Sequence, residues 1–389
     1  MDDKVYANCL LCGASELSFV ELPYIGKTIF APHGNLSLAE CNQCGFVRNI
    51  AYNRESCAEF YGKNESGYIG SEQFSSNVPA LIEKHERHLR FIANFYSTGV
   101  WWDLGCCDGA LQICARRTSL QDTTKTELHS LDFSVSHLKD IGERYSIAFH
   151  EGSIESLDID TRADLYSMMH VLEHVNDPVN LLRRLRVSAT SHTTLIMEVP
   201  DRGGYGNDRI YWYSLVEHIN HFSLQNLVSL CSLAGWELVS AERYTGITVG
   251  LSYPAVICAF KPRLEVSAGE QSETNDSSKL LTRDLDLLSQ SVNKVIERQR
   301  VCFWGRSKLF NLIAPNLVGD YSVYDVSTDH SRDASLNSRF VSSPPTPSDY
   351  DCIIISAFSS YYSIAKIAES LEWQPSQLIN IMRIAALAE

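Results

Sequence analysis

Positive charge is in deficit in this sequence. There are 33 Lys and Arg residues against 47 Asp and Glu residues, which gives a formal net charge of −14. A chain of that charge repels a phosphate backbone unless a local basic stripe compensates. The short cluster of Arg183, Arg184 and Arg186 is better explained as a solvated helix face. We therefore expect no nucleic-acid partner.

Long apolar runs are missing as well. No stretch approaches the roughly 20 consecutive apolar residues of a membrane-spanning helix, and the start of the chain, Met1 to Lys4, does not resemble a signal peptide. We expect a cytoplasmic protein with no membrane partner. In that reducing compartment the 12 cysteines are not expected to form disulfides. Clustered cysteines then indicate a metal, and scattered ones indicate small core residues.

Length and composition indicate several folded units. The chain has 389 residues, of which 44% are hydrophobic and 21% charged, as in ordinary globular proteins. That length exceeds one typical core, so two or three domains are expected. We predict a zinc-binding module at 1–60, an α/β domain with a preceding lid and helix at 61–262, a polar linker at 263–279, and a smaller Rossmann-like α/β domain at 280–389.

Four cysteines near the start are clustered. Cys9 with Cys12, and Cys41 with Cys44, form two Cys-x-x-Cys-Gly knuckles separated by 28 residues. Each knuckle places two thiolates on one side of a tight turn, and two knuckles complete a tetrahedral sulfur site for Zn²⁺. Four protein ligands leave no open position, so we expect a structural zinc. Free or redox-active cysteines are the alternative.

The segment from Val100 to Leu111 is typical of a strand, a tight glycine turn and the start of a helix at 110–117. Gly105 and Gly109 lack a Cβ, so the backbone can turn sharply and a ligand can lie against it. The acid at the end of the strand, Asp103, suits a cationic or amino-bearing ligand. The Lys of phosphate-cradling loops is absent, which argues against a nucleoside triphosphate.

Further strands are expected at 128–133, 164–169, 194–199 and 256–260, with helical stretches between them. Such alternation predicts a parallel sheet that binds its ligand at the carboxyl edge. Asp132 lies at that edge, where a carboxylate can accept both ribose hydroxyls of an adenosine. Helices are also predicted at 78–96, after Ser223 and at 280–298. A second strand, glycine turn and helix begins at Val301, and this last domain either binds a ligand or serves packing.

The pattern Asp-x-Gly-x-x-Asp-Gly from Asp103 resembles the first motif of class I S-adenosylmethionine (SAM) methyltransferases, although Cys107 replaces the middle glycine. Later segments at 131–134, 151–154 and 168–178 resemble the following motifs in order. The resemblance implies a Rossmann-like sheet of the class I SAM methyltransferase fold and S-adenosyl-L-methionine as the cofactor. The residues implied to bind it are Asp103, Gly105, Asp108, Gly109, Asp132, Phe133, Ser153, Ile154 and His170.

Several histidines fall at the same predicted edge: His170, His174, His218 and His221. Methyl transfer to carbon needs a general base that removes a proton next to a carbonyl, and donors that hold the enolate. Histidine is the side chain best suited to that role at neutral pH. Glu217 beside His218 can orient a ring or hold a sugar hydroxyl.

Together, the cysteine module, the SAM motifs, the Glu-His-x-x-x-Phe-Ser element at 217–223 and the second α/β domain resemble the sugar C-methyltransferases, which act on nucleotide-linked 4-keto-deoxysugars. The resemblance implies His218 as the base, with His174, Glu217 and the lid residue Tyr68 also catalytic. Two positions depart from that family: Leu215 replaces a tyrosine, and its Gly-x-Gly-x-Lys-Gly loop is reduced to the segment from Trp304 to Lys308.

The sequence thus predicts a SAM-dependent methyltransferase that methylates carbon of a nucleotide-linked deoxysugar. One alternative is an O- or N-methyltransferase acting on a sugar or another small metabolite. The other is a catalytically inactive SAM-fold scaffold whose zinc module docks a partner. Oligomeric state is not indicated.

Overall fold

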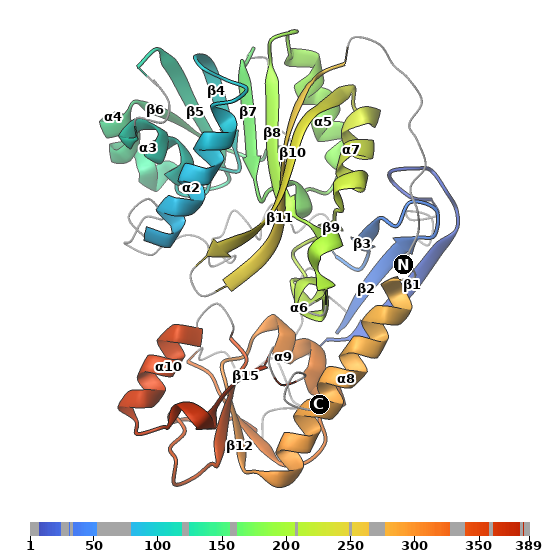
Figure 1. Ribbon diagram of the computed structural model, residues 1–389, viewed down its shortest axis with the longest axis vertical. Coiled ribbons are helices and arrows are strands. Elements are labelled where there is room, and N and C mark those ends of the chain that lie inside the picture. The colour runs from blue at the N-terminus through green and yellow to red at the C-terminus, as the bar shows by residue number, and fades with distance from the viewer. Residues whose placement is uncertain are drawn as a thin grey trace.

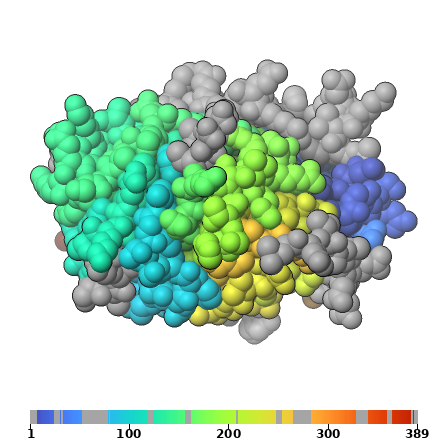
Figure 2. Space-filling view, turned by 90° about the horizontal axis from the view of Figure 1, so that it is seen from above, coloured from blue at the N-terminus to red at the C-terminus, as the bar shows by residue number. Residues whose placement is uncertain are grey.

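In the residues that it describes, the computed structural model has three sheets: the seven-stranded sheet is at the top of Figure 1, the C-terminal sheet is at the bottom, and the small first sheet lies at one side. It describes residues 8–24, 31, 34–52, 79–118, 124–155, 162–206, 209–248, 251–263, 277–326, 339–357, 361–381 and 384. Seen from above (Figure 2), the N-terminal residues in blue lie at one end and the teal residues that follow the glycine loop lie at the other.

The central sheet has seven strands in the order β10-β11-β8-β7-β4-β5-β6. The five strands from β4 to β8 are parallel. The expected fully parallel sheet is wrong for the last predicted strand, because β11 returns from a hairpin with β10 and therefore runs antiparallel to β8. The bounds are β4 Gly99–Leu104, β5 Thr126–Asp132, β6 Ile147–Glu151, β7 Leu165–Met169, β8 Thr194–Pro200, β10 Trp236–Thr248 and β11 Leu251–Pro262.

Helices cover both faces of this sheet (Figure 1). Neighbouring residues of a strand point to opposite faces, so Trp101 joins the core cluster that contains Leu89 and Leu111, whereas Trp102 joins the one that contains Leu182 and Leu227. The helices are α2 Pro79–Ile92, α3 Ala110–Arg117, α4 Lys139–Tyr145, α5 Pro178–Ser188, α6 Arg209–Ser214 and α7 Leu224–Leu233, with short 3₁₀ turns η2 Ser136–Leu138, η3 Leu172–His174 and η4 Arg202–Gly204.

The first module is a small antiparallel sheet of β1 Leu17–Pro23, β2 Asn35–Cys41 and β3 Val47–Asn49. Its fourth strand comes from far along the chain: β9, Asn220–His221, pairs with β3. The side chain of Asn49 also donates to the carbonyl oxygen of Val216 at 3.0 Å. The Glu-His-x-x-x-Phe-Ser segment is therefore fastened to the cysteine-bearing module.

The last part of the chain forms a parallel sheet in the order β13-β12-β14-β15, as the repeated strand and glycine turn predicts. The long helix α8 packs against β1 and lies beside this sheet (Figure 1). The bounds are α8 Ser277–Arg298, β12 Val301–Trp304, α9 Lys308–Ile313, η6 Ala314–Asn316, β13 Tyr321–Tyr324, β14 Cys352–Ile355, α10 Tyr361–Ser370, η9 Pro375–Gln377 and β15 Leu378–Asn380. Over the residues that the structure describes, no helix has the length and apolar character to cross a membrane.

Candidate functional site

The glycine loop joins β4 to α3. Gly105 and Gly109 have φ angles of +74° and +73°. A Cβ on Gly105 would lie 2.5 Å from a methyl carbon of Val171, and one on Gly109 would lie 2.7 Å from the ring of Phe149. Both positions therefore require glycine for conformation and for space. Cys107, which stands where the methyltransferase motif has its middle glycine, also adopts a left-handed φ of +53°.

Asp132 fastens this loop to β5. Its Oδ2 accepts the backbone N–H of Cys107, and its Oδ1 accepts that of Phe133, both at 2.7 Å. Burial raises the pKa of this carboxyl, while the two backbone hydrogen bonds oppose the shift. Each carboxylate oxygen has two acceptor sites, so Asp132 retains capacity for the two ribose hydroxyls expected at this position.

Asp103 lies beneath the loop at the end of β4. It is buried, and its Oδ1 accepts a hydrogen bond from the hydroxyl of Ser167 at 2.6 Å. Burial raises its pKa to about 7. A cationic group bound beside Asp103 would favour its charged form, as expected for the amino group of a ligand.

The other predicted cofactor residues share the same edge, because β6, β5, β4 and β7 are neighbours in the sheet. Oδ1 of Asp108 accepts the N–H of Ala110, the first residue of α3, at 3.1 Å. Ser153 and the buried Ile154 follow β6. Their contacts with a cofactor remain predictions.

His170 follows β7 in a left-handed conformation, with φ of +58°. Its Nε2 lies 2.6 Å from Oε1 of Glu198, and its Nδ1 lies 3.3 Å from Oε1 of Glu173. Burial and Lys84 lower the pKa of His170, but the two carboxylates outweigh them and the net shift is upward. His170 is thus held in a buried ion pair.

Glu198 is the centre of a buried network that sequence reasoning missed. Its Oε2 lies 2.8 Å from Nε2 of His88 on α2, and neither side chain is exposed. The hydroxyl of Tyr244 on β10 also donates to Glu198. Burial alone would raise the pKa of Glu198, but His88 and His170 hold it well below its usual value. One signal was present in the sequence: a lone acid inside the otherwise apolar strand β8.

The predicted catalytic histidines do come together. The rings of His174 and His218 lie 4.9 Å apart and nearly perpendicular. Nδ1 of His174 is 2.9 Å from the backbone oxygen of Glu217 and donates to it, and the side chain of Asn220 donates to the backbone oxygens of Leu172 and Val175 at 3.3 and 2.7 Å. Burial and then His174 lower the pKa of His218 well below 6.5, so its imidazole is neutral at pH 7.

Glu217 connects this edge to the C-terminal sheet. Its buried carboxylate pairs with the ammonium of Lys308, the first residue of α9. Burial raises the pKa of Glu217, but Lys308 outweighs it and the net shift is downward. Lys308 belongs to the reduced glycine segment and was not expected to reach the site. Tyr68 lies outside the described residues.

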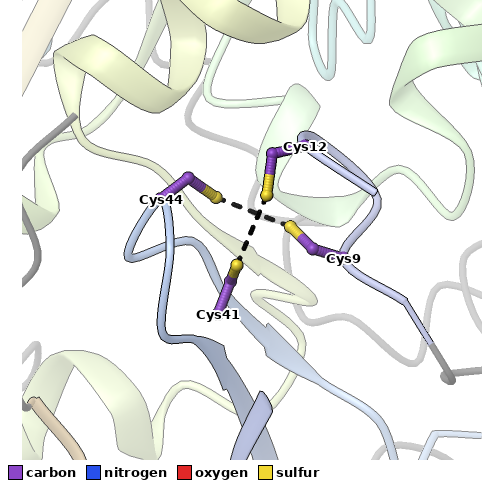
Figure 3. Close-up of side chains that lie close together, drawn as sticks. All are labelled: Cys9, Cys12, Cys41 and Cys44. Carbon is purple, nitrogen blue, oxygen red and sulfur yellow. Dashed lines mark hydrogen bonds between the residues drawn. The ribbon is translucent and has the colours of Figure 1, made fainter. Parts of the chain in front are cut away.

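The Sγ atoms of the four predicted metal-ligating cysteines point toward one another and all lie within 4.8 Å of each other (Figure 3). The Sγ atoms of Cys9 and Cys44, and those of Cys12 and Cys41, are 3.5 Å apart. A tetrahedral zinc with Zn–S bonds of about 2.3 Å needs sulfurs about 3.8 Å apart, so the four thiols fit such an ion. Of the eight scattered cysteines predicted as core residues, those at 106, 114, 231, 258, 302 and 352 are buried, and Cys107 is only half-buried. Cys57 lies outside the described residues.

Residues 77–241 match the family described as "Methyltransferase domain", a range that runs from the start of α2 into β10. The chain matches none of the curated proteins.

Solved structures show likeness at low identity. One is the 1,6-didemethyltoxoflavin-N1-methyltransferase of Burkholderia thailandensis, at 15% identity and a TM-score of 0.44 over 59% of this chain and 96% of that one. Another is the N-methyltransferase NodS of Bradyrhizobium japonicum, at 11% identity and a TM-score of 0.40 over 52% and 97%. The family match over residues 77–241, the glycine loop and the seven-stranded sheet support a SAM-dependent methyltransferase domain of the class I fold in that part of the chain.

Proposed function

We propose that this enzyme transfers the methyl group of SAM to a carbon atom next to the keto group of a nucleotide-linked deoxysugar. The observation that carries the proposal is the pair of histidines at the carboxyl edge: His218 is buried and neutral at pH 7, and His174 stands beside it. A neutral imidazole can accept a proton, which is what carbon methylation requires first.

The proposed methyl transfer has three steps. His218 removes the proton from the carbon, the negative charge moves to the keto oxygen, and His174 helps to hold that enolate. The carbon then attacks the sulfonium methyl in line, so that a C–C bond forms and the S–C bond breaks. S-adenosylhomocysteine leaves as a neutral thioether. Pre-positioning of both reactants supplies much of the acceleration.

The pairing of Glu217 with Lys308 supports an acceptor of this size. It joins the catalytic edge to the C-terminal sheet, so a molecule that lies against both would be longer than a single sugar ring. A nucleotide-linked sugar has that length, with the sugar at the histidines and the nucleotide toward α9. In this assignment the C-terminal unit at 280–389 is a substrate domain.

We also propose that Cys9, Cys12, Cys41 and Cys44 hold a structural Zn²⁺. The spacing of the thiols and the left-handed φ angles of Gly13 and Gly45, +73° and +65°, support it. With four protein ligands the ion would fix the fold and leave the methyl transfer to other residues. Metal analysis of the purified protein should return one zinc per chain, and a Cys41→Ser variant should lose it.

Deuterium exchange tests the carbon assignment. A dTDP-linked 4-keto-deoxysugar is incubated in D₂O with the enzyme and S-adenosylhomocysteine, which allows deprotonation without methyl transfer. We expect deuterium at the carbon next to the keto group, and no exchange with His218→Asn. With SAM present, a product methylated on oxygen or nitrogen, together with no exchange, would contradict the proposal and favour an O- or N-methyltransferase.

A further inference from the structure

A buried carboxylate, that of Glu173, lies at the edge that holds His218. Glu173 and His174 belong to η3, whereas His218 follows α6. One carboxylate oxygen of Glu173 and one ring nitrogen from each of the two histidines all lie within 4.8 Å of one another. The side chain of Glu173 is only 1% exposed. With so little water to screen it, a carboxylate at that distance acts strongly on the charge of a histidine ring.

Glu173 and Glu198 share one buried cation. Oε1 of Glu173 lies 3.3 Å from Nδ1 of His170, and Oε1 of Glu198 lies 2.6 Å from Nε2 of the same ring. The pKa of His170 is raised by these carboxylates, so the ring carries its proton. Two carboxylates thus face one imidazolium, and the three ion-paired side chains keep one excess negative charge.

Two residues of α2 face the other members of this ion pair. Nε2 of His88 lies 2.8 Å from Oε2 of Glu198, but burial lowers the pKa of His88, so that ring is uncharged at pH 7. The ammonium of Lys84 lies 5.5 Å from the ring centroid of Tyr253, and its charge lowers the pKa of His170. These groups act on Glu198 and His170, whereas Glu173 is the member that lies beside His218.

His218 needs a negative charge nearby when it acts as a base. Burial lowers its pKa, and four neighbouring groups lower it further: His174, His221, Lys308 and His170. These causes keep the ring neutral at rest, but they also oppose the imidazolium that forms when His218 takes a proton. A carboxylate beside a histidine base offsets such a cost, as the aspartate does in serine proteases.

Glu217 is the neighbouring alternative for that counter-charge. Its carboxylate, however, pairs with the ammonium of Lys308 on α9, so its charge is already compensated by a full positive charge. Its contact with His174 is made by the backbone oxygen, which accepts from Nδ1 at 2.9 Å. Glu173 shares its only ion-paired cation with a second carboxylate and is therefore the better source of negative charge.

We propose that Glu173 is the positioning residue that stabilises the imidazolium of His218 during methyl transfer. The inference rests on the proposed function and adds the counter-charge that its base requires. The proton leaves the acceptor carbon for a ring nitrogen of His218, and the C–H bonding pair becomes part of the enolate. With that proton in place, Glu173, Glu198, His170 and His218 together carry no net charge.

Deuterium exchange can separate the charge of Glu173 from its shape. The full-length protein is incubated in D₂O with S-adenosylhomocysteine and a saturating dTDP-linked 4-keto-deoxysugar, and the exchange rate is expressed per S-adenosylhomocysteine site counted by calorimetry. Glu173→Gln keeps the size and removes the charge, so we expect exchange at least about tenfold slower. Glu173→Asp keeps the charge and should exchange faster than Glu173→Gln. The Kd for S-adenosylhomocysteine should stay within about twofold in both variants.

Glu198→Gln is the matched control, because it removes the other carboxylate that pairs with His170 and leaves Glu173 beside His218. A general disturbance of the buried ion pair should follow from either change. We expect Glu198→Gln to slow exchange per site by no more than about threefold, well short of the effect of Glu173→Gln.

The outcomes distinguish this role from the proposed function. Exchange at the wild-type rate in Glu173→Gln, or equally slow exchange in Glu173→Gln and Glu198→Gln, overturns the role of Glu173 and leaves His218 as the proposed base. Loss of S-adenosylhomocysteine binding in both Glu173 variants would show that this residue holds the fold of the edge, and would overturn the role as well. A wild-type protein that binds S-adenosylhomocysteine but exchanges no deuterium would instead refute the proposed acceptor.

Discussion

Cys107 occupies a backbone conformation that suits glycine better. Its φ of +53° brings a Cβ close to the following carbonyl oxygen, which costs about 1–2 kcal/mol for a residue other than glycine. Cys107→Gly relieves that strain, although glycine loses more conformational freedom on folding. We expect a net gain in the free energy of unfolding of up to about 1 kcal/mol, measured by urea denaturation without SAM. A loss of stability would show that the thiol makes packing contacts worth more than the strain.

Asp103 contributes to the free energy of unfolding by an amount that depends on pH, and the shift of its pKa gives the sign of that contribution. Burial raises its pKa in the folded protein to about 7 from 3.8, so the folded state binds its proton more tightly than the unfolded state. Its contribution is therefore fully present below about pH 4 and is lost as the pH rises through 7. Urea unfolding at pH 6 and pH 8 should show a smaller decline for Asp103→Asn than for the wild type. An equal decline in both proteins would mean that Asp103 does not titrate in this range.

At the level of helices and strands, apolar runs and glycine turns in the sequence are sufficient to predict most central strands and α3. The helix predicted at 110–117 has those bounds in the structure, because a glycine turn precedes it and its buried face is apolar. β6 and β10 were missed. β10 is an edge strand with charged residues such as Glu242 and Arg243 on it, so it lacks the apolar run that marks a buried strand.

The packing of helices against the sheet explains why the buried network around Glu198 was not predicted. His88 lies on α2 and Glu198 on β8, 110 residues apart, and only the packing of that helix against the sheet makes them partners. Glu198→Gln would remove the nearer of the two buried carboxylates that face His170, and it would remove the counter-charge of His88, so we expect a loss of about 3 kcal/mol in the free energy of unfolding. Glu86→Gln, at an exposed ion pair with Arg90 on the same helix, should change stability by less than about 0.5 kcal/mol. Similar losses in both variants would contradict a structural role for the network.

Three units of the molecule assemble the edge that holds His218, the proposed base. His218 precedes β9, which pairs with β3 of the first module, and Glu217 is paired with Lys308 of α9. Motif order alone placed the proposed cofactor residues at one edge, since each lies at the end of a strand of one sheet or in the loop that follows it. The contacts with the first module and with α9 depend on how separate units pack, and no local pattern in the sequence encodes them.

The contact between Glu217 and Lys308, which joins two of these units, gives the last prediction. Lys308→Met leaves Glu217 buried without its cation, so the segment around His218 should rearrange, whereas the predicted cofactor residues from Asp103 to His170 lie on strands β4 to β7 or in the loops that follow them. We expect the Kd for SAM to stay within about twofold and kcat/KM for the acceptor to fall at least about tenfold. Arg300→Met, which breaks an exposed pair with Asp351 in the same unit, is the control and should leave both values unchanged. If Lys308→Met weakened SAM binding and acceptor turnover equally, the C-terminal unit would support the fold of the whole site and would have no separate part in acceptor binding.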